Sequence, residues 1–191
     1  MQLRDETIHV GDVTLTISRP VAPDALIDED AFARDEFLPY WAELWPAARA
    51  LAAALPADLA GVRIVELGCG LGVPSLVAAA RGAVVTATDW APDAVTLLVE
   101  NATANGLELR AEARDWRDPW PERFDLALAA DVLYEERNVQ PLVERLRELA
   151  PVALVALAGR PYEAAFLGLA APVTEIAARV VRLDRPQLPG A

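Results

Sequence analysis

Residues 64–79 read IVELGCGLGVPSLVAA, and this stretch decides the fold. An apolar strand ends at Glu66, and a turn with glycine at every second position follows it. A helix is predicted next, with Pro74 in its first turn, where a missing N–H breaks no hydrogen bond. Glycine lets the backbone approach a bulky ligand closely, and the helix N-terminus offers unpaired N–H donors. The stretch therefore predicts a strand–turn–helix unit that binds a nucleotide-like molecule.

The glycine spacing and the preceding acid narrow the class of ligand. The dinucleotide fingerprint G-x-G-x-x-G receives a pyrophosphate, but here the third glycine comes one residue early and Val73 stands in its place. Glu66 would repel a pyrophosphate and would suit a cationic amino group. S-adenosylmethionine has an amino group and a sulfonium and no phosphate, so it is the favoured ligand. A turn without ligand and a dinucleotide-binding dehydrogenase are the alternatives.

Length and cysteine content bound the class of protein. The 191 residues suit one domain, with an N-terminal hairpin and arm at 1–36 and a cofactor-binding core at 37–191. We expect no signal peptide at the acidic N-terminus and no membrane span, because no apolar run reaches ~20 residues. Cys69 is the only cysteine, which excludes an intrachain disulfide and fits a reducing cytoplasm. One cysteine and one histidine do not favour a structural zinc site, so no metal is expected.

The charge balance bears on the partners. The net charge is −12, with 29 acidic residues and 17 basic residues, all of them arginine. Nucleic-acid binders neutralise phosphates with clustered lysine and arginine, so no nucleic-acid partner is expected. An acidic surface favours basic partners through long-range attraction.

Alternating strand and helix signals after residue 62 predict a Rossmann-like, doubly wound α/β sheet. The apolar runs at 126–130 and 152–158 are typical of parallel strands buried on both faces. The predicted strands are Arg63–Glu66, Val84–Thr88, Leu109–Ala113, Leu126–Ala130 and Val152–Ala158, with an antiparallel C-terminal edge formed by Val173–Ala177 and Val180–Leu183. The predicted helices are Glu43–Leu55, Gly72–Arg81, Pro92–Asn105, Glu136–Leu149 and Pro161–Leu169. A β-hairpin is predicted over Thr7–Ser18, and a loop or short helix over Asp24–Arg34.

Acidic and aromatic residues follow the predicted strands, at the edge where such sheets bind ligands. Asp89 comes about twenty residues after the glycine turn, where an acid can accept the ribose hydroxyls, or it caps the next helix. Trp90 follows it directly. Asp115 could accept the adenine amine, and Trp116 could cover the purine face or pack as an ordinary aromatic residue.

The fourth strand ends in the most informative pair for catalysis. Asp131 leaves a buried apolar strand, which is unfavourable unless its carboxylate has a partner. Tyr134 follows three residues later and could wall a channel or donate a hydrogen bond. Methyl transfer to an amine needs a neutral nucleophile held in line, and Asp131 could direct the amine lone pair. The alternative is that Asp131 caps the following helix.

Three aromatic residues precede the sheet within residues 40–45, and aromatic faces attract cations. This segment either forms a lid over the ligand or packs as a hydrophobic latch. Arg160, after the fifth strand, could touch a substrate or only pair with a surface carboxylate. His9, in the hairpin, is expected to be structural.

The motifs resemble those of class I S-adenosylmethionine-dependent methyltransferases. They are the glycine motif at 66–72, Thr88-Asp89, Asp115-Trp116 and the D-x-x-Y motif at 131–134. The segment YWAELWP at 40–46 narrows the resemblance to the seven-β-strand family 16 group, which includes protein-lysine methyltransferases and nicotinamide N-methyltransferase-like proteins. The resemblance covers residues 37 to 185.

The resemblance implies that Asp131 and Tyr134 meet the target nucleophile, and that the cofactor leaves as S-adenosylhomocysteine. The residues expected to bind the cofactor are Trp45, Glu66, Gly68, Cys69, Gly70, Asp89, Trp90, Asp115, Trp116 and Asp131. Val132-Leu133 replaces the two prolines of the N/D-P-P-Y motif, which disfavours nucleic-acid bases as substrates. The leading hypothesis is methylation of a protein lysine. The alternatives are a small pyridine or amine as acceptor, and a binding module without catalysis.

Overall fold

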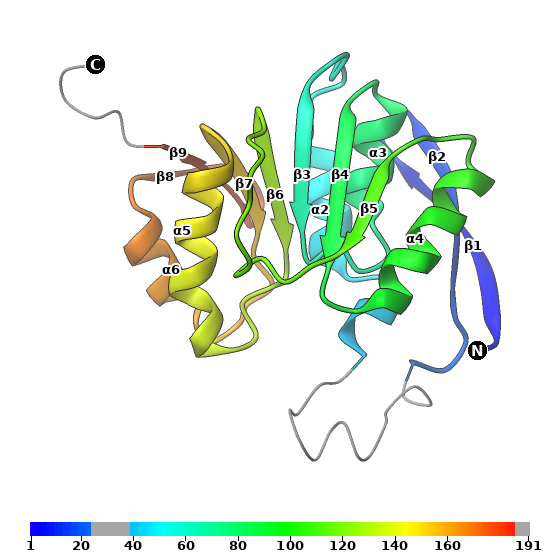
Figure 1. Ribbon diagram of the computed structural model, residues 1–191, viewed down its shortest axis with the longest axis horizontal. Coiled ribbons are helices and arrows are strands. Elements are labelled where there is room, and N and C mark those ends of the chain that lie inside the picture. Colours follow the sequence, from blue (N-terminus) through cyan, green and yellow to red (C-terminus); the bar gives the residue numbers. More distant parts are fainter. Residues whose placement is uncertain (24–38, 186–191) are drawn as a thin grey trace.

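The computed structural model describes residues 1–23 and 39–185 as a central sheet covered by helices on both faces (Figure 1). The predicted loop or short helix at Asp24–Arg34 lies outside the described residues. The strands of the main sheet are β3 (Arg63–Leu67), β4 (Val84–Asp89), β5 (Arg110–Ala113), β6 (Leu126–Ala130), β7 (Val152–Ala156), β8 (Val173–Ala177) and β9 (Val180–Asp184). The helices are η2 (Tyr40–Ala42), α2 (Pro46–Ala54), α3 (Val73–Ala80), α4 (Pro92–Ala104), η3 (Glu136–Asn138), α5 (Val139–Leu149) and α6 (Glu163–Ala170).

The strand order β5-β4-β3-β6-β7-β9-β8 confirms the predicted sheet. The strands β3 to β7 are parallel, whereas β9 runs antiparallel to both β7 and β8. The order reverses between β3 and β6, and open α/β sheets bind ligands beyond the carboxyl ends of the strands at such a point. The ends of β3, β4 and β6 therefore frame the expected site.

Alternating side chains of the buried strands form a core on each face of the sheet. Ile64 belongs to the cluster beneath α2, α3 and α4, whereas the next residue, Val65, belongs to the cluster beneath α5 and α6. Both side chains are fully buried. Burial on both faces is what the apolar runs at 126–130 and 152–158 predict, because helices cover each face of a parallel sheet.

The N-terminal hairpin is a separate two-stranded sheet, β1 (Leu3–Val10) and β2 (Val13–Pro20), that lies beside α4 (Figure 1). Asn105 accepts a hydrogen bond from the Thr16 N–H through Oδ1 at 2.8 Å and donates through Nδ2 to the Thr16 carbonyl at 2.8 Å. Asn101 makes the same pair of contacts with the Ser18 backbone. The two amide side chains thus take the place of a neighbouring strand.

Several predicted boundaries differ from the structure, and two of them have a clear local cause. The helix predicted over Glu43–Leu55 begins only at Pro46, because the residue before a proline avoids the helical region and Trp45 is extended, with ψ 136°. The strand predicted to end at residue 158 ends at Ala156, after which the Leu157 N–H donates to the Arg179 carbonyl. His9 is on β1, where Nδ1 contacts the Thr14 hydroxyl at 3.0 Å.

Among the described residues, no helix is both long and apolar enough to cross a membrane. In the same ranges, no group of histidine, cysteine and carboxylate side chains is arranged to hold a metal ion.

Candidate active site

The glycine turn between β3 and α3 is shaped by close contacts on both sides. Gly68 and Gly70 have φ of 66° and 51°, a region that side chains with a Cβ rarely adopt. A Cβ on Gly68 would lie 2.9 Å from Cγ1 of Val132, and one on Gly70 would lie 3.1 Å from the carbonyl oxygen of Trp41. The turn therefore packs directly against the end of β6 and against the segment before α2.

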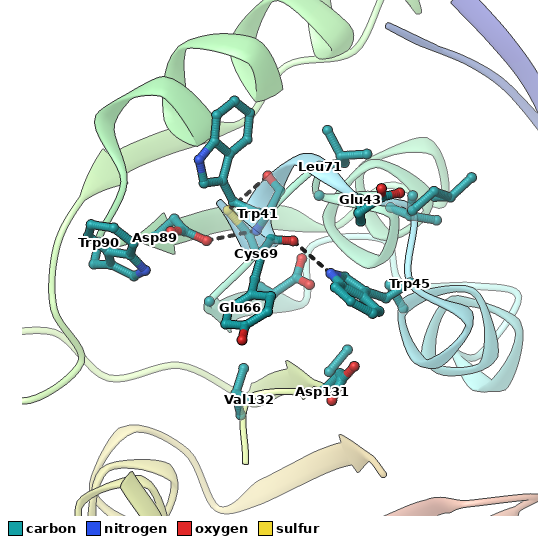
Figure 2. Close-up of a pocket in the computed structure, with 18 of the residues that line it drawn as sticks. Trp41, Glu43, Trp45, Glu66, Cys69, Leu71, Asp89, Trp90, Asp131 and Val132 are labelled. Atoms are coloured by element: carbon teal, nitrogen blue, oxygen red, sulfur yellow. Dashed lines mark hydrogen bonds between the residues drawn. The ribbon is translucent and has the colours of Figure 1, made fainter. Parts of the chain in front are cut away.

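A cavity opens at this turn, and we call it the acidic cavity (Figure 2). Its lining contains four carboxylates and, within the described ranges, neither arginine nor histidine. The four acids are Glu43, Glu66, Asp89 and Asp131. Such a set of acids favours a ligand that carries positive charge over a phosphate, because a nearby cation favours the ionised form of each acid.

Glu66 lies at the floor of the acidic cavity and is 1% exposed. Its Oε2 accepts hydrogen bonds from the backbone N–H of Ser75 at 2.9 Å and from the Ser75 hydroxyl. Burial raises the pKa of Glu66 to about 8. Ser75 was not predicted from the sequence as the partner of Glu66, because it belongs to no motif. Its position in the first turn of α3 is the only feature of the sequence that could have indicated this role.

Asp89 connects the end of β4 to both neighbouring backbone segments. Its Oδ2 accepts a hydrogen bond from Gly70 N at 2.8 Å, and its Oδ1 accepts one from Ala91 N at 3.0 Å. Burial raises its pKa above the ordinary range. Because each carboxylate oxygen has two lone pairs, Asp89 can fix the glycine turn and still accept hydroxyl groups from a ligand.

Asp131 is paired with Arg160, a residue from the loop after β7. The guanidinium donates from Nε to Oδ1 at 2.7 Å and from Nη2 to Oδ2 at 2.8 Å. Asp131 has φ 53°, and strained conformations of this kind cluster at functional sites. Asp131 does not cap the following helix, because η3 begins after Glu135 and has no side-chain cap.

Aromatic rings close the cavity from the N-terminal side. The Tyr40 ring lies 5.0 Å from the Tyr134 ring and 6.3 Å from the Trp45 ring, and Trp45 Nε1 donates to the Tyr40 carbonyl at 2.7 Å. Burial raises the pKa of Tyr134, so its phenol stays neutral. All three aromatic residues at 40–45 line the cavity, as the lid interpretation expects, and Trp41 is also buried in the core, as the latch interpretation expects.

The acidic cavity is narrow while this aromatic segment lies over it. Its volume is about 60 Å³, whereas ligand pockets typically measure about 300–1,000 Å³. A nucleoside-sized ligand therefore needs more room than the acidic cavity offers by itself.

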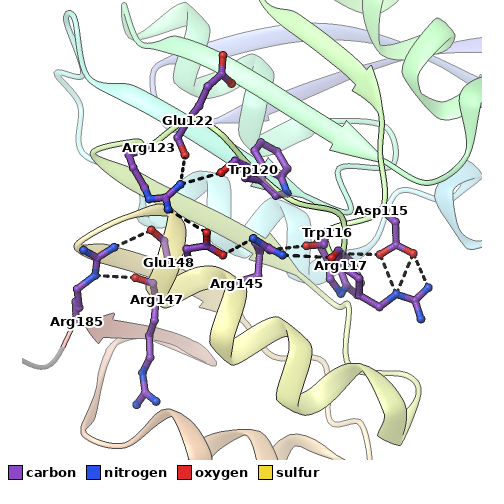
Figure 3. Close-up of polar contacts among 10 residues, drawn as sticks. All are labelled: Asp115, Trp116, Arg117, Trp120, Glu122, Arg123, Arg145, Arg147, Glu148 and Arg185. Carbon is purple, nitrogen blue, oxygen red and sulfur yellow. Dashed lines mark hydrogen bonds and ion pairs between the residues drawn. The ribbon is translucent and has the colours of Figure 1, made fainter.

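Asp115 lines an adjoining cavity of about 290 Å³, and Trp90 and Trp116 line both this cavity and the acidic one. Asp115 accepts hydrogen bonds from the Arg117 guanidinium and backbone, so its carboxylate is already partnered. The buried indole N–H of Trp116 has no hydrogen-bond partner in the described part of the chain. Arg145 of α5 donates to the Trp116 carbonyl at 2.6 Å and fixes this loop (Figure 3).

Cys69 is a buried free thiol inside the turn. Its backbone N–H donates to the Thr88 carbonyl at 2.9 Å, which ties the turn to β4. Burial raises the pKa of the Cys69 thiol, so it lacks the thiolate character of a redox nucleophile.

Comparison with known proteins places the chain in a family. A family described as lysine methyltransferase matches residues 41–165, which is more than half of the chain. The chain belongs to this lysine methyltransferase family. The match begins at Trp41 and includes the glycine turn, Asp89, Asp131 and Tyr134. The resemblance expected from the motifs is thereby confirmed.

Curated proteins that are named as lysine methyltransferases match about half of the chain. Mouse EEF1A lysine methyltransferase 3 is 36% identical over 98 residues, which cover 48% of this chain and 42% of that protein. The Danio rerio electron transfer flavoprotein beta subunit lysine methyltransferase is 35% identical over 103 residues, which cover 51% of this chain and 40% of that protein. The chain thus spans less than half the length of these relatives.

Solved structures confirm the methyltransferase fold. The T. thermophilus 16S rRNA methyltransferase RsmC, in complex with AdoMet and guanosine, has a TM-score of 0.73 at 18% identity, covering 96% of this chain and 51% of that chain. The magnesium protoporphyrin IX methyltransferase of Synechocystis with bound SAM has a TM-score of 0.59 at 18% identity, covering 85% of this chain and 99% of that chain. At these low identities, the structural similarity shows the fold alone. It does not identify the methyl acceptor.

Proposed function

We propose that this protein transfers a methyl group from S-adenosylmethionine to the side-chain amine of a lysine in a protein. The observation that carries the proposal is the acidic cavity, whose lining in the described ranges has four carboxylates and no cationic side chain. S-adenosylmethionine combines an ammonium, a sulfonium and one carboxylate, so its net positive charge suits this lining. The membership in the lysine methyltransferase family supports the acceptor class.

The donors and acceptors around the cavity fit this cofactor. Glu66 would face the amino group, and Asp89 would accept the ribose hydroxyls with its free lone pairs. Trp90 and Trp116 would border the adenine, and the unpartnered indole N–H of Trp116 offers a donor there. When bound, the cofactor supplies a methyl group on a positively charged sulfur.

Asp131 and Tyr134 would meet the acceptor. The side chain of Asp131 is 3% exposed and borders the acidic cavity from the end of β6. An acceptor amine that donates an N–H to this carboxylate has its lone pair directed away from Asp131 and into the cavity. Orientation of this kind contributes most of the rate enhancement expected for a direct methyl transfer. The Tyr134 and Tyr40 rings would exclude water from the channel.

The test is transfer of a tritiated methyl group from S-adenosylmethionine to proteins of a cell extract. This chain contains no lysine, so lysine self-methylation contributes no background. We expect label on lysine in the protein fraction, and Asp131→Asn should reduce it about 100-fold or more while the affinity for S-adenosylmethionine changes less than threefold. Asp184→Asn is the matched control, because Asp184 also pairs with an arginine, Arg182, but on β9.

Other outcomes would identify the competing functions. Label that enters only the low-molecular-weight fraction would indicate a small amine as acceptor. Calorimetry without any S-adenosylmethionine binding would contradict the proposal and favour a module without catalysis. The net charge of −12 supports a basic protein, and not a nucleic acid, as the partner. The single buried cysteine supports a cytoplasmic location, which cell fractionation would test.

A further inference from the structure

A second cavity lies on the other side of Asp131, and we call it the side cavity. It measures about 410 Å³ and lies between the start of α2, the end of β7 and the β8–β9 turn. Asp131 and Trp45 line both cavities, whereas Arg160 lines only the side cavity. An acceptor in the side cavity therefore lies next to both Asp131 and Arg160.

Arg160 is held in place by several independent contacts. Glu163 Oε1 accepts hydrogen bonds from the backbone N–H groups of residues 158, 159 and 160, at 2.6, 2.6 and 3.0 Å. The Arg160 guanidinium lies 5.5 Å from the centre of the Trp45 ring. The hydrogen bonds with Asp131 raise the pKa of Arg160, so its positive charge is permanent. The Asp131–Arg160 ion pair is therefore a fixed structural feature where the two cavities meet.

The charge of Arg160 opposes a second cation at Asp131. A lysine ammonium has a pKa of about 10.4 and is protonated at neutral pH, yet only the neutral amine has a lone pair to give. A bare buried carboxylate would stabilise the ammonium, and a neighbouring cation has the opposite effect. The other titratable and charged groups that face this position are Tyr40, Glu43, Glu66, Asp89, Tyr134, Glu163 and Arg179.

Among the charged groups near Asp131, Arg160 has the largest effect on an incoming amine, because the other groups are neutral, are paired or face the expected position of the cofactor. Arg179 is paired with Glu163 at 3.0 Å and is largely exposed. Tyr134 stays neutral, and Glu43 is close to Arg19, at 3.6 Å. Glu66 and Asp89 face the region assigned to the cofactor's own cationic and hydroxyl groups.

We propose that Arg160 is a positioning residue that admits the acceptor amine to Asp131 in its neutral form. This inference rests on the proposed function. The amine first loses its proton to water, and its lone pair then forms the N–C bond while the electrons of the S–C bond return to sulfur. The product is a methylated ammonium, whose binding at Asp131 is disfavoured by the positive charge of Arg160. Arg160 thus favours both the reactive form of the substrate and the release of the product.

The first test measures binding of n-butylamine, a probe of the lysine side chain, by calorimetry in the presence of S-adenosylhomocysteine. If only the neutral amine binds, the affinity of the wild type should rise about tenfold per pH unit between pH 7 and 9. Arg160→Gln should bind the probe at least tenfold more tightly than the wild type at pH 7 and should lose this slope. Equal slopes in both proteins would refute the role of Arg160.

The second test is the pH profile of methyl transfer to extract proteins. The acid limb of Arg160→Gln should move up by about one pH unit or more, whereas Arg160→Lys should keep the wild-type limb. The double variant D131N/R160Q has no unpaired buried charge and keeps the proposal testable if the single variant fails to fold. Its n-butylamine affinity should regain the wild-type dependence on pH, and a dependence that stays lost would contradict the proposal.

Arg182→Gln is the matched control, because Arg182 also forms a two-pronged pair with an aspartate, at the exposed end of β9. It should leave both profiles unchanged. An inactive wild type would refute the proposed function itself, whereas an active wild type with an unshifted Arg160→Gln variant would refute only the inference about Arg160.

Discussion

At the scale of single residues, burial of Glu66 in the acidic cavity lowers the stability of the folded protein at alkaline pH, while the same side chain is expected to bind the cofactor. Its carboxylate is buried with Ser75 as its partner, and its pKa rises from 4.5 to about 8. The folded state therefore holds a proton that the unfolded state releases above pH 4.5. This group contributes stability that is fully present below pH 4.5 and is lost as the pH rises to about 8.

Glu66→Gln should therefore stabilise the protein without cofactor at alkaline pH. We expect a gain of about 1–3 kcal/mol at pH 9 and little change at pH 5, measured by urea unfolding. The same variant should bind S-adenosylmethionine at least tenfold more weakly, because a charge-assisted hydrogen bond is lost. Glu122→Gln, at a half-buried surface site, is the control. A destabilised Glu66→Gln variant at pH 9 would show that the buried charge is not the cause.

At the scale of elements, the hairpin is joined to the main domain by side chains of one helix. Asn101 and Asn105 are four residues apart at the end of α4, so they lie on the same face of the helix. Each pairs with one residue of β2 through both its carbonyl and its amide group. This arrangement satisfies part of the strand edge that would otherwise be open to another chain.

Asn101→Ala should destabilise the protein by about 1–3 kcal/mol, because the backbone groups of Ser18 lose their buried partner. Asn105→Ala should destabilise it less, since its contacts with Thr16 are exposed. Urea unfolding measures both effects, and Glu100→Ala, on the exposed side of α4, is the control. Hairpin amides that exchange no faster in Asn101→Ala than in the wild type would contradict this account.

At the scale of the whole molecule, the charge of −12 sets the long-range field that a substrate meets. Surface charges act over about 8 Å at physiological ionic strength, so salt weakens the approach of a basic protein. Contacts inside the acidic cavity are screened much less, because they are removed from bulk water.

Methyl transfer to basic extract proteins should therefore fall severalfold between about 20 mM and 500 mM salt, where the Debye length shrinks from tens of ångströms to a few. The affinity for n-butylamine should change less than twofold over the same range. Salt titration of both quantities makes the comparison. Equal salt effects on the small probe and on the proteins would exclude long-range steering by the protein surface.

The amino-acid sequence by itself determined the sheet, because apolar strands and glycine turns are local patterns. The strand–turn–helix stretch at 64–79 and the acids at the ends of β3, β4 and β6 indicate which edge of the sheet holds the site. Parallel strands bring their carboxyl ends together at that edge. The antiparallel edge of β8 and β9 was likewise readable from two short apolar runs.

Only the tertiary structure decided which partners these side chains have. The Asp131–Arg160 pair joins residues 29 positions apart, and the contacts of Asn101 with Ser18 join residues 83 positions apart. No local pattern encodes such pairs, because they depend on how distant loops meet across the sheet. The acids of the site can therefore be recognised from the local sequence. Only the folded chain shows that one of them, Asp131, is paired with Arg160.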